Sequence, residues 1–238
     1  MDGEDGIIAK HGGYENLLSF QIAELVFDVT VHFCNRYISR RSRTHDQMVQ
    51  AARSGVQNIV EGSEVSGTSK KMEMKLTGVA RASLEELRRD YRDYLRQRGL
   101  EEWPPYHAVL MRFKSQRYYC LQDVRRFVQE ERGRTRGLGG GMDRHGRTRK
   151  DKDRRGRSGS TDSDPKGQSN TKPSMPVHKR PCGFMPTSGI VANVTLSLLN
   201  LCSYLLAQQL AAQAAAFERE GGFTERLYRT RQNWKKKR

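Results

Sequence analysis

Apolar side chains recur every three or four residues through the first 131 positions, which is the spacing of helices that bury one face. The pattern predicts helices over about 15–38, 46–62, 69–99 and 104–131. Their expected buried faces are, in order, Ile22, Leu25, Val26, Val29 and Phe33; Met48, Ala52, Gly55 and Ile59; Met72, Leu76, Val79, Ser83 and Leu87; and Phe113, Cys120, Val124 and Phe127. Helices of this length joined by short turns predict an all-α fold, an up-down-up-down antiparallel four-helix bundle.

Capping residues set the expected helix ends. Asp46 is a candidate N-cap of the second helix, and Ser69 or Thr68 of the third, because their side-chain oxygens can accept from free backbone N–H groups. Gly62 and the serine-rich turn after it suit a left-handed C-cap of the second helix. Pro104 can open the fourth helix, since its missing N–H would have no partner there.

A long uncharged stretch lies further along the chain. No Asp, Glu, Lys or Arg occurs between Arg180 and Glu218, which exceeds the roughly 20 residues that span a bilayer. A polar stripe nevertheless follows helical spacing, at Asn193, Ser197, Asn200 and Tyr204, opposite an apolar side of Val194, Leu198, Leu201, Leu205 and Leu206. We therefore expect a soluble amphipathic helix, ended by Gly221 and Gly222, and a short helix capped by Thr224. Because a single helix cannot hide its apolar side, it should dock on the bundle or on another subunit.

Basic residues are unevenly distributed. The 238 residues include 43 Lys and Arg against 27 Asp and Glu, a net charge of +16. Residues 1–131 hold 20 basic and 19 acidic residues, residues 132–180 hold 15 and 5, and residues 181–238 hold 8 and 3. The middle part is mainly Gly, Arg, Ser and Asp, so it cannot bury enough apolar surface to offset the entropy of ordering. We expect it to be a disordered basic linker.

Four parts of the chain follow from these patterns: a flexible N-terminus over 1–13, the bundle over 14–131, a disordered Arg/Gly/Ser-rich linker over 132–188, and suffix helices with a basic tail over 189–238. Clustered Lys and Arg favour phosphate contacts with little sequence readout. The candidate nucleic-acid-binding residues are Arg149, Lys150, Lys152, Arg154, Arg155 and Arg157 in the linker, and Lys235, Lys236, Lys237 and Arg238 in the tail. The alternative is that the linker is only a solvated spacer.

No catalytic motif is recognisable in the sequence. The six histidines have no metal-ligand spacing, and the four cysteines form no C-x-x-C pair. The stretch Gly62–Ser69 resembles a phosphate loop only superficially, because Thr68 stands where that loop requires Lys. We therefore expect no enzyme, no cofactor and no metal site. The acidic N-terminal residues are unlike a secretory signal, so a cytoplasmic protein with reduced thiols is expected.

Three segments resemble a known family. Gln47–Gly62, QMVQAARSGVQNIVEG, and Lys70–Leu87, KKMEMKLTGVARASLEEL, are similar to the second- and third-helix motifs of small bacterial four-helix-bundle proteins. That family was first noticed inside intervening sequences of large-subunit ribosomal RNA genes. The segment from Asn193 through EGGFTERLYR, Glu220–Arg229, is similar to the suffix domain that follows such a bundle in one subfamily.

The resemblance implies a non-enzymatic bundle that assembles as a ring, often a pentamer. A distant relative is the accessory protein of diversity-generating retroelements, which binds nucleic acid and a reverse transcriptase. The family's Asn-Ile-Ala-Glu-Gly segment is matched by Asn58, Glu61 and Gly62, with Val60 replacing the usual Ala. A structural role is expected for this trio, with an inter-helix hydrogen bond from Asn58 and an ion pair of Glu61 with Arg53 or Arg81.

Two functional hypotheses follow. In the first, a non-enzymatic homo-oligomer binds RNA or DNA without sequence specificity, or assists a nucleic-acid enzyme such as a neighbour-encoded reverse transcriptase, through its basic linker and tail. In the second, the protein is an interaction scaffold for another protein, and the suffix helix is its docking element. Insertion into a membrane is not expected.

Overall fold

The structure is a computed structural model, and it describes residues 12–139 and 185–236. All regular structure in these two ranges is helical, which confirms the predicted all-α class. The elements are a 3₁₀ helix η1 (Tyr14–Asn16) and the α-helices α1 (Leu18–Tyr37), α2 (Arg43–Val65), α3 (Lys70–Gln97), α4 (Ala108–Lys114), α5 (Leu121–Gly139), α6 (Thr187–Glu220) and α7 (Phe223–Lys236). The expected flexible N-terminus and most of the expected linker lie outside the described residues.

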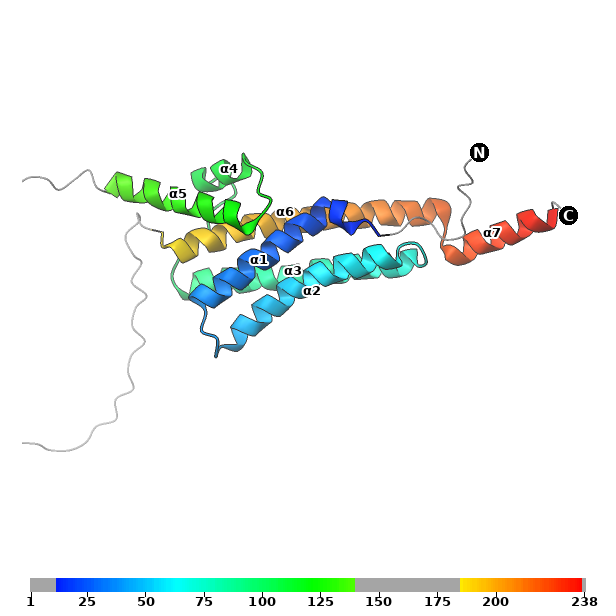
Figure 1. The fold of residues 1–238 in the computed structure, drawn as a ribbon, viewed down its shortest axis with the longest axis horizontal. Helices are drawn as coiled ribbons and strands as arrows, with labels where there is room; N and C mark the ends of the chain where they lie inside the picture. Colours follow the sequence, from blue (N-terminus) through cyan, green and yellow to red (C-terminus); the bar gives the residue numbers. More distant parts are fainter. Residues whose placement is uncertain (1–11, 140–184, 237–238) are drawn as a thin grey trace, which may run out of the picture.

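Four helices, α1, α2, α3 and α6, pack lengthwise against one another (Figure 1). Helix α6 runs antiparallel to α3. Its Asn193 bonds Glu101, just after the end of α3, and its Gln213 bonds Glu73, near the start of α3. The fourth position beside α1, α2 and α3 is therefore occupied by α6, whereas the sequence pattern placed residues 104–131 there.

The segment predicted as the fourth helix forms two shorter helices. Helix α4 has seven residues, about 10 Å of helix, whereas α3 has 28 residues, about 42 Å. Phe113 at the end of α4 stacks on Tyr118 with ring centroids 4.1 Å apart, and Phe127 of α5 meets Phe113 at 5.1 Å. This aromatic cluster holds α4 against α5, so the segment forms two helices packed on each other instead of one long helix. The pair covers the first half of α6 (Figure 1).

The first half of α6 is buried on all sides, because α1 and α3 lie on one side of it and the α4–α5 pair on another. Four consecutive residues, Ala192, Asn193, Val194 and Thr195, are at most 1% exposed, and Ile190 is 2% exposed. A helix without a solvent face needs no amphipathic pattern. The polar stripe expected from Asn193 to Tyr204 is thus solvent-facing only at its later end, where Asn200 and Tyr204 are exposed.

By length and composition alone, one described stretch, Thr187–Glu225, is apolar enough to cross a membrane. In the fold, 61% of its most apolar window is buried.

The expected buried faces hold for the first two helices and shift in the third. Ile22, Leu25, Val26, Val29, Phe33, Met48, Ala52, Gly55 and Ile59 are all buried. In α3, Leu87 is buried as expected, but Met72 is 43% and Val79 40% exposed, and Ala80 and Leu84 take the other central positions. The apolar stripe of this helix is wider than the face that α2 and α6 cover, so its outer edge faces solvent. Cys120, expected in the core, is also exposed because it precedes α5.

Several helix ends differ from the expected ones. Ser42 caps α2 by accepting from the Thr44 N–H at 3.3 Å, and Asp46 lies within the first turn. Helix α2 continues through Gly62 to Val65, so the expected C-cap is wrong. Helix α5 continues to Gly139, eight residues into the expected linker. The start of α2 follows from the Ser42 hydroxyl cap, and its continuation through Gly62 follows from the contact of Gly62 with α3.

Candidate nucleic-acid interface

Two glycines separate α7 from α6. Gly221 has φ 72°, a left-handed value that glycine adopts at little cost, and its N–H donates to the Phe217 carbonyl at 2.9 Å. The N–H of Gly222 donates to Glu225 Oε2 at 2.9 Å, which holds the start of α7. The chain therefore changes direction, and α7 extends past the end of the packed helices (Figure 1).

Helix α7 is strongly basic. Its 14 residues include Arg226, Arg229, Arg231, Lys235 and Lys236, against the single acid Glu225. Arg229, Arg231, Lys235 and Lys236 are exposed. Clustered cations on a protruding helix attract polyanions, and each contact with a phosphate releases a counterion.

Two large aromatic side chains lie among these cations. Tyr228 is 64% and Trp234 70% exposed, although rings of this size are usually mostly buried. One open hollow of about 610 Å³ runs along this side of α7, and it is lined by Leu227, Tyr228, Thr230, Arg231, Gln232, Trp234 and Lys235. Rings and cations therefore face the same space.

The ten residues predicted to contact nucleic acid are placed unequally. Lys235 and Lys236 lie at the exposed end of α7. Lys237 and Arg238, and the six linker residues Arg149, Lys150, Lys152, Arg154, Arg155 and Arg157, lie outside the described residues. The prediction missed Arg231 and the two exposed rings. The sequence could have pointed to Tyr228 and Arg231. Together with Lys235 they follow spacings of three and four residues, which place them on one face of a helix.

Seven basic side chains of the helices before α6 are engaged with carboxylates. The described ion pairs join Lys70 to Glu73, Arg88 to Glu85, Arg92 to Glu102, Arg96 to Asp93, Arg112 and Arg134 to Glu131, and Arg126 to Asp123. Surface pairs of this kind contribute little to stability, but they reduce the net field of the helices that carry them. Of the described helices, α7 has the largest excess of basic over acidic residues, five against one.

The motif residues Asn58, Glu61 and Gly62 all belong to α2. The Asn58 amide donates to the Ser54 carbonyl at 2.8 Å and to Ser54 Oγ at 3.2 Å, and Ser54 Oγ lies 3.0 Å from Ser83 Oγ of α3. The inter-helix bond expected of Asn58 is thus relayed through Ser54.

Among the described residues, Glu61 does not form the expected ion pair, and Gly62 does not end α2 as expected. Glu61 is exposed, and in the described part of the chain it makes no ion pair with Arg53 or Arg81. Gly62 lies against α3: a Cβ there would be 3.4 Å from the Leu76 Cβ and 3.5 Å from the Glu73 carbonyl oxygen. The glycine therefore allows a close approach of α2 to α3.

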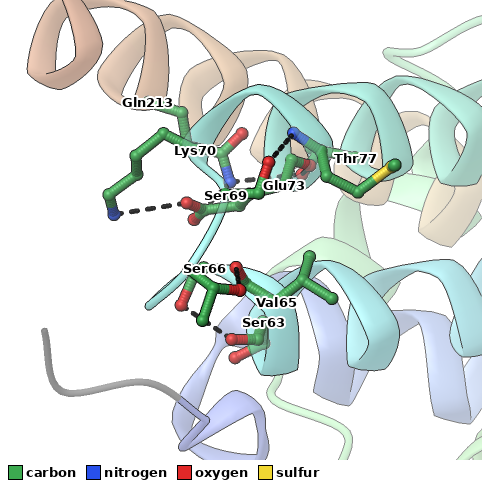
Figure 2. Close-up of polar contacts among 10 residues, drawn as sticks. Ser63, Val65, Ser66, Ser69, Lys70, Glu73, Thr77 and Gln213 are labelled. Atoms are coloured by element: carbon green, nitrogen blue, oxygen red, sulfur yellow. Dashed lines mark hydrogen bonds and ion pairs between the residues drawn. The ribbon is translucent and has the colours of Figure 1, made fainter. Parts of the chain in front are cut away.

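Figure 2 shows the turn between α2 and α3, the stretch that superficially resembles a phosphate loop. Ser69 Oγ accepts from the Met72 N–H at 3.2 Å and caps α3, as expected, and Ser66 Oγ donates to the Ser63 carbonyl at 2.7 Å. Thr68 bonds back to the α2 end. The hydroxyls of the turn thus serve its own backbone.

The adjacent acid Glu73 is shared between two partners (Figure 2). Lys70 Nζ lies 3.3 Å from its Oε2, and the buried Gln213 Nε2 donates to its Oε1 at 2.9 Å. Gln213 also donates to Thr77 Oγ1 at 3.2 Å. Lys70 is therefore held by a carboxylate that anchors α6 to α3, rather than directed at a ligand.

A shallow groove of about 780 Å³ lies between α2 and α3, and its lining includes Arg43, Asp46, Gln50, Ser54, Ser83, Glu86 and Asp90. Partial burial, with the nearby Asp93 and Glu86 carboxylates, raises the pKa of Asp90. In the described residues, no group of three or more His, Cys, Asp or Glu side chains could hold a metal ion. Burial raises the pKa of Cys34 and of Cys202 to about 12, so these thiols stay protonated near neutral pH and are poor nucleophiles.

Comparisons of the chain with models of protein families, with curated proteins and with solved structures gave no match. The class that the described geometry defines is an all-helical protein whose C-terminal helix combines exposed rings with exposed cations.

Proposed function

We propose that the protein is a non-enzymatic, homo-oligomeric helical protein that binds RNA or DNA without sequence specificity, or assists a nucleic-acid enzyme in doing so. The observation that carries the proposal is α7, which extends beyond the packed helices with Arg229, Arg231, Lys235 and Lys236 exposed. Residues 1–131, which include α1, α2 and α3, hold 20 basic and 19 acidic residues and are therefore nearly neutral. In this proposal the packed helices keep the protein folded, and the basic helix α7 binds the nucleic acid.

The basic cluster over residues 149–157 acts together with α7 in this proposal. Each segment alone binds weakly, because solvent-exposed cations gain little from a few phosphates at physiological salt. Joined in one chain, the second contact is intramolecular and the affinity rises steeply. Assembly of several chains would multiply the effect.

The resemblance to ring-forming bundles of the intervening-sequence family supplies the proposal of assembly, in which a pentamer is the expected form. It also supplies the proposed partner, a reverse transcriptase or another neighbour-encoded protein. Reduced, buried thiols at Cys34 and Cys202 agree with a proposed cytoplasmic location.

Fluorescence polarisation with a 30-nucleotide RNA, at several salt concentrations, tests the proposal. We expect affinity to fall linearly on a log–log plot, with a slope of about 0.7 to 0.9 per phosphate neutralised. The triple variant Arg231→Glu, Lys235→Glu, Lys236→Glu should bind more weakly and with a shallower slope.

A control variant carries the same change of charge on the packed helices. Lys71→Glu, Lys75→Glu and Arg81→Glu replace three exposed cations of α3. Equal losses from the two triple variants would mean that net charge alone governs binding, and the assignment to α7 would be abandoned. Absence of binding by the unmodified chain would refute the proposed function.

A specific observation favours the second candidate, the interaction scaffold. Past the region covered by α4 and α5, Leu201 of α6 is 41% and Tyr204 60% exposed. Only this later half of the suffix helix could dock a partner, because the first half is already buried. Co-purification of a protein that survives nuclease and high salt, and is lost in Leu201→Ser, Tyr204→Ser, would support this candidate.

A further inference from the structure

We propose that α7 binds single-stranded in preference to double-stranded nucleic acid, with bases stacked on Tyr228 and Trp234 and the neighbouring phosphates neutralised by Arg231 and Lys235. The inference rests on the proposed function and names its substrate class. The juxtaposition that supports it is one hollow lined by both rings and both cations.

The exposure of the rings is the first argument. Tyr228 and Trp234 are 64% and 70% exposed, and they belong to a helix that packs along no other described helix. Leaving two such rings in water costs free energy that burial would recover. Bases offer flat faces to which aromatic rings stack regardless of base identity.

The spacing of the rings fits a strand of stacked bases. Six residues of helix separate Tyr228 from Trp234, which is a rise of about 9 Å along the axis. A stacked strand advances about 3.4 Å per nucleotide. Six residues also turn the helix by about 600°, which places the two rings about 120° apart around its axis with Arg231 between them. A strand that partly wraps α7 can therefore meet both rings with bases several nucleotides apart, and Arg231 is placed for the intervening backbone.

A duplex would leave the rings unused. Its base faces are already stacked on one another, and a protein reads it through base edges and phosphates. Tyr228 and Trp234 have one hydrogen-bonding group each and large apolar faces. Cations alone would favour the duplex, because its phosphates are more densely spaced. A preference for single strands therefore has to come from the rings.

A lipid surface is the other partner of basic amphipathic helices. Insertion there requires a broad apolar face, since membrane affinity scales with the apolar area buried. Beyond the two rings, the apolar residues of α7 are Phe223 and Leu227, and both are only partly exposed. The chemistry of α7 thus favours bases over acyl chains.

The test compares a 20-nucleotide oligo(U), an oligo(dT) of the same length and a 20-base-pair duplex, all titrated into the full chain. Trp234→Ala and Tyr228→Ala should each weaken single-strand binding by about tenfold, as loss of one base stack does, with a smaller effect on the duplex. Tyr119→Ala is the matched control, because this ring is 78% exposed but lies outside α7. It should change no affinity.

Indole fluorescence provides an independent signal. Stacking on a base quenches tryptophan, and the other tryptophan, Trp103, is only 8% exposed and stacks on His107. Quenching by oligo(U) or oligo(dT) should therefore occur in the unmodified chain and vanish in Trp234→Phe. A difference between the two oligonucleotides would identify RNA or DNA as the preferred strand.

The remaining outcomes are distinguishable. Equal losses for single strand and duplex in Trp234→Ala, or no loss in either, would overturn stacking while leaving the proposed function intact. Binding to vesicles of phosphatidylcholine and phosphatidylserine that depends on Trp234, without an effect on oligonucleotides, would overturn it in favour of a lipid surface. Absence of binding to every oligonucleotide would refute the proposed function and this inference together.

Discussion

Asn193 is a polar residue with three hydrogen bonds in an apolar part of the core. It is 1% exposed. Its Oδ1 accepts from the backbone N–H of Trp103 at 2.7 Å, and its Nδ2 donates to the backbone carbonyls of Glu101 at 3.0 Å and Gly189 at 2.9 Å. The residue thereby ties the start of α6 to the segment that follows α3. Because these hydrogen bonds replace those with water, a polar side chain can be buried there.

Replacing Asn193 by Ala should destabilise the protein by about 2 to 4 kcal/mol, because the buried Trp103 N–H loses its acceptor and a cavity remains. Urea unfolding followed by circular dichroism measures the change. Asn200→Ala is the control on the same helix, since Asn200 is exposed and accepts a bond from Arg88 at 3.0 Å. It should cost less than about 0.5 kcal/mol, and equal losses from both would contradict the role given to Asn193.

The sequence could not reveal this role. Asn193 shares helical spacing with Ser197, Asn200 and Tyr204, so a polar stripe facing water was the natural interpretation. Two of its three partners, Glu101 and Trp103, lie about 90 residues earlier in the chain, in a segment with no local signal of contact. By contrast, Ser69 was recognisable as a cap because its partner, the Met72 N–H, is three residues away.

Helices α1, α2 and α3 could be anticipated because their apolar periods are strong and their turns are short. Docking of α6 on these helices was one of the two expected outcomes, but its place between α1 and α3, where residues 104–131 were expected, could not be anticipated. An element that is apolar all around lacks the period from which a face is inferred, and the aromatic residues Phe113, Tyr118 and Phe127 folded the competing segment into a pair of short helices instead.

The close contact between α2 and α3 leads to a prediction for two glycine-to-alanine variants, one at the contact and one away from it. A Cβ on Gly55 would lie 2.6 Å from Leu84 Cδ2 and 2.8 Å from its Cγ, whereas a Cβ on Gly78 of α3 meets nothing within 4 Å. Gly78→Ala should stabilise the protein by up to about 1 kcal/mol through helix propensity. Gly55→Ala gains the same propensity but loses about 1 to 3 kcal/mol by overpacking against a fully buried leucine.

Thermal or urea unfolding of the two variants measures the difference directly. Gly55→Ala is expected to be at least about 1 kcal/mol less stable than Gly78→Ala. Equal stabilities would show that α2 and α3 are not in such close contact at Gly55.

The two C-terminal helices differ in their surroundings. Helix α6 completes the core with Ile190, Val194, Leu199 and Leu206, each at most 2% exposed, whereas α7 packs along no other described helix. Folding and the proposed ligand contact thus belong to consecutive helices, with Gly221 at the break between them.

Truncation should separate the two roles. A chain ending at residue 139 lacks α6, exposes the apolar faces of α1 and α3, and should lose cooperative thermal unfolding. A chain ending at residue 222 lacks only α7 and should keep its melting temperature within a few degrees. Circular dichroism melts of both chains give the comparison, and a cooperative transition in the shorter chain would contradict the core role of α6.

The charge of the chain could be divided by sequence alone into a near-neutral first part and basic later parts. The sequence could not reveal that the C-terminal charge lies on a helix that extends beyond the packed helices. Gly221 and Gly222 could equally have been followed by a helix that folds back on them. The near-neutral part carries ion pairs internally, as Arg92 with Glu102 and Arg112 with Glu131 illustrate.

The proposed function requires that nucleic acid is held by the basic helix α7 and not by the packed helices. Ultraviolet cross-linking of the full chain to a 4-thiouridine oligonucleotide, followed by peptide mapping, locates the contact. We expect cross-links at Tyr228 and Trp234, with additional ones in the peptides that contain residues 149–157. Cross-links confined to peptides of α1, α2 or α3 would contradict it.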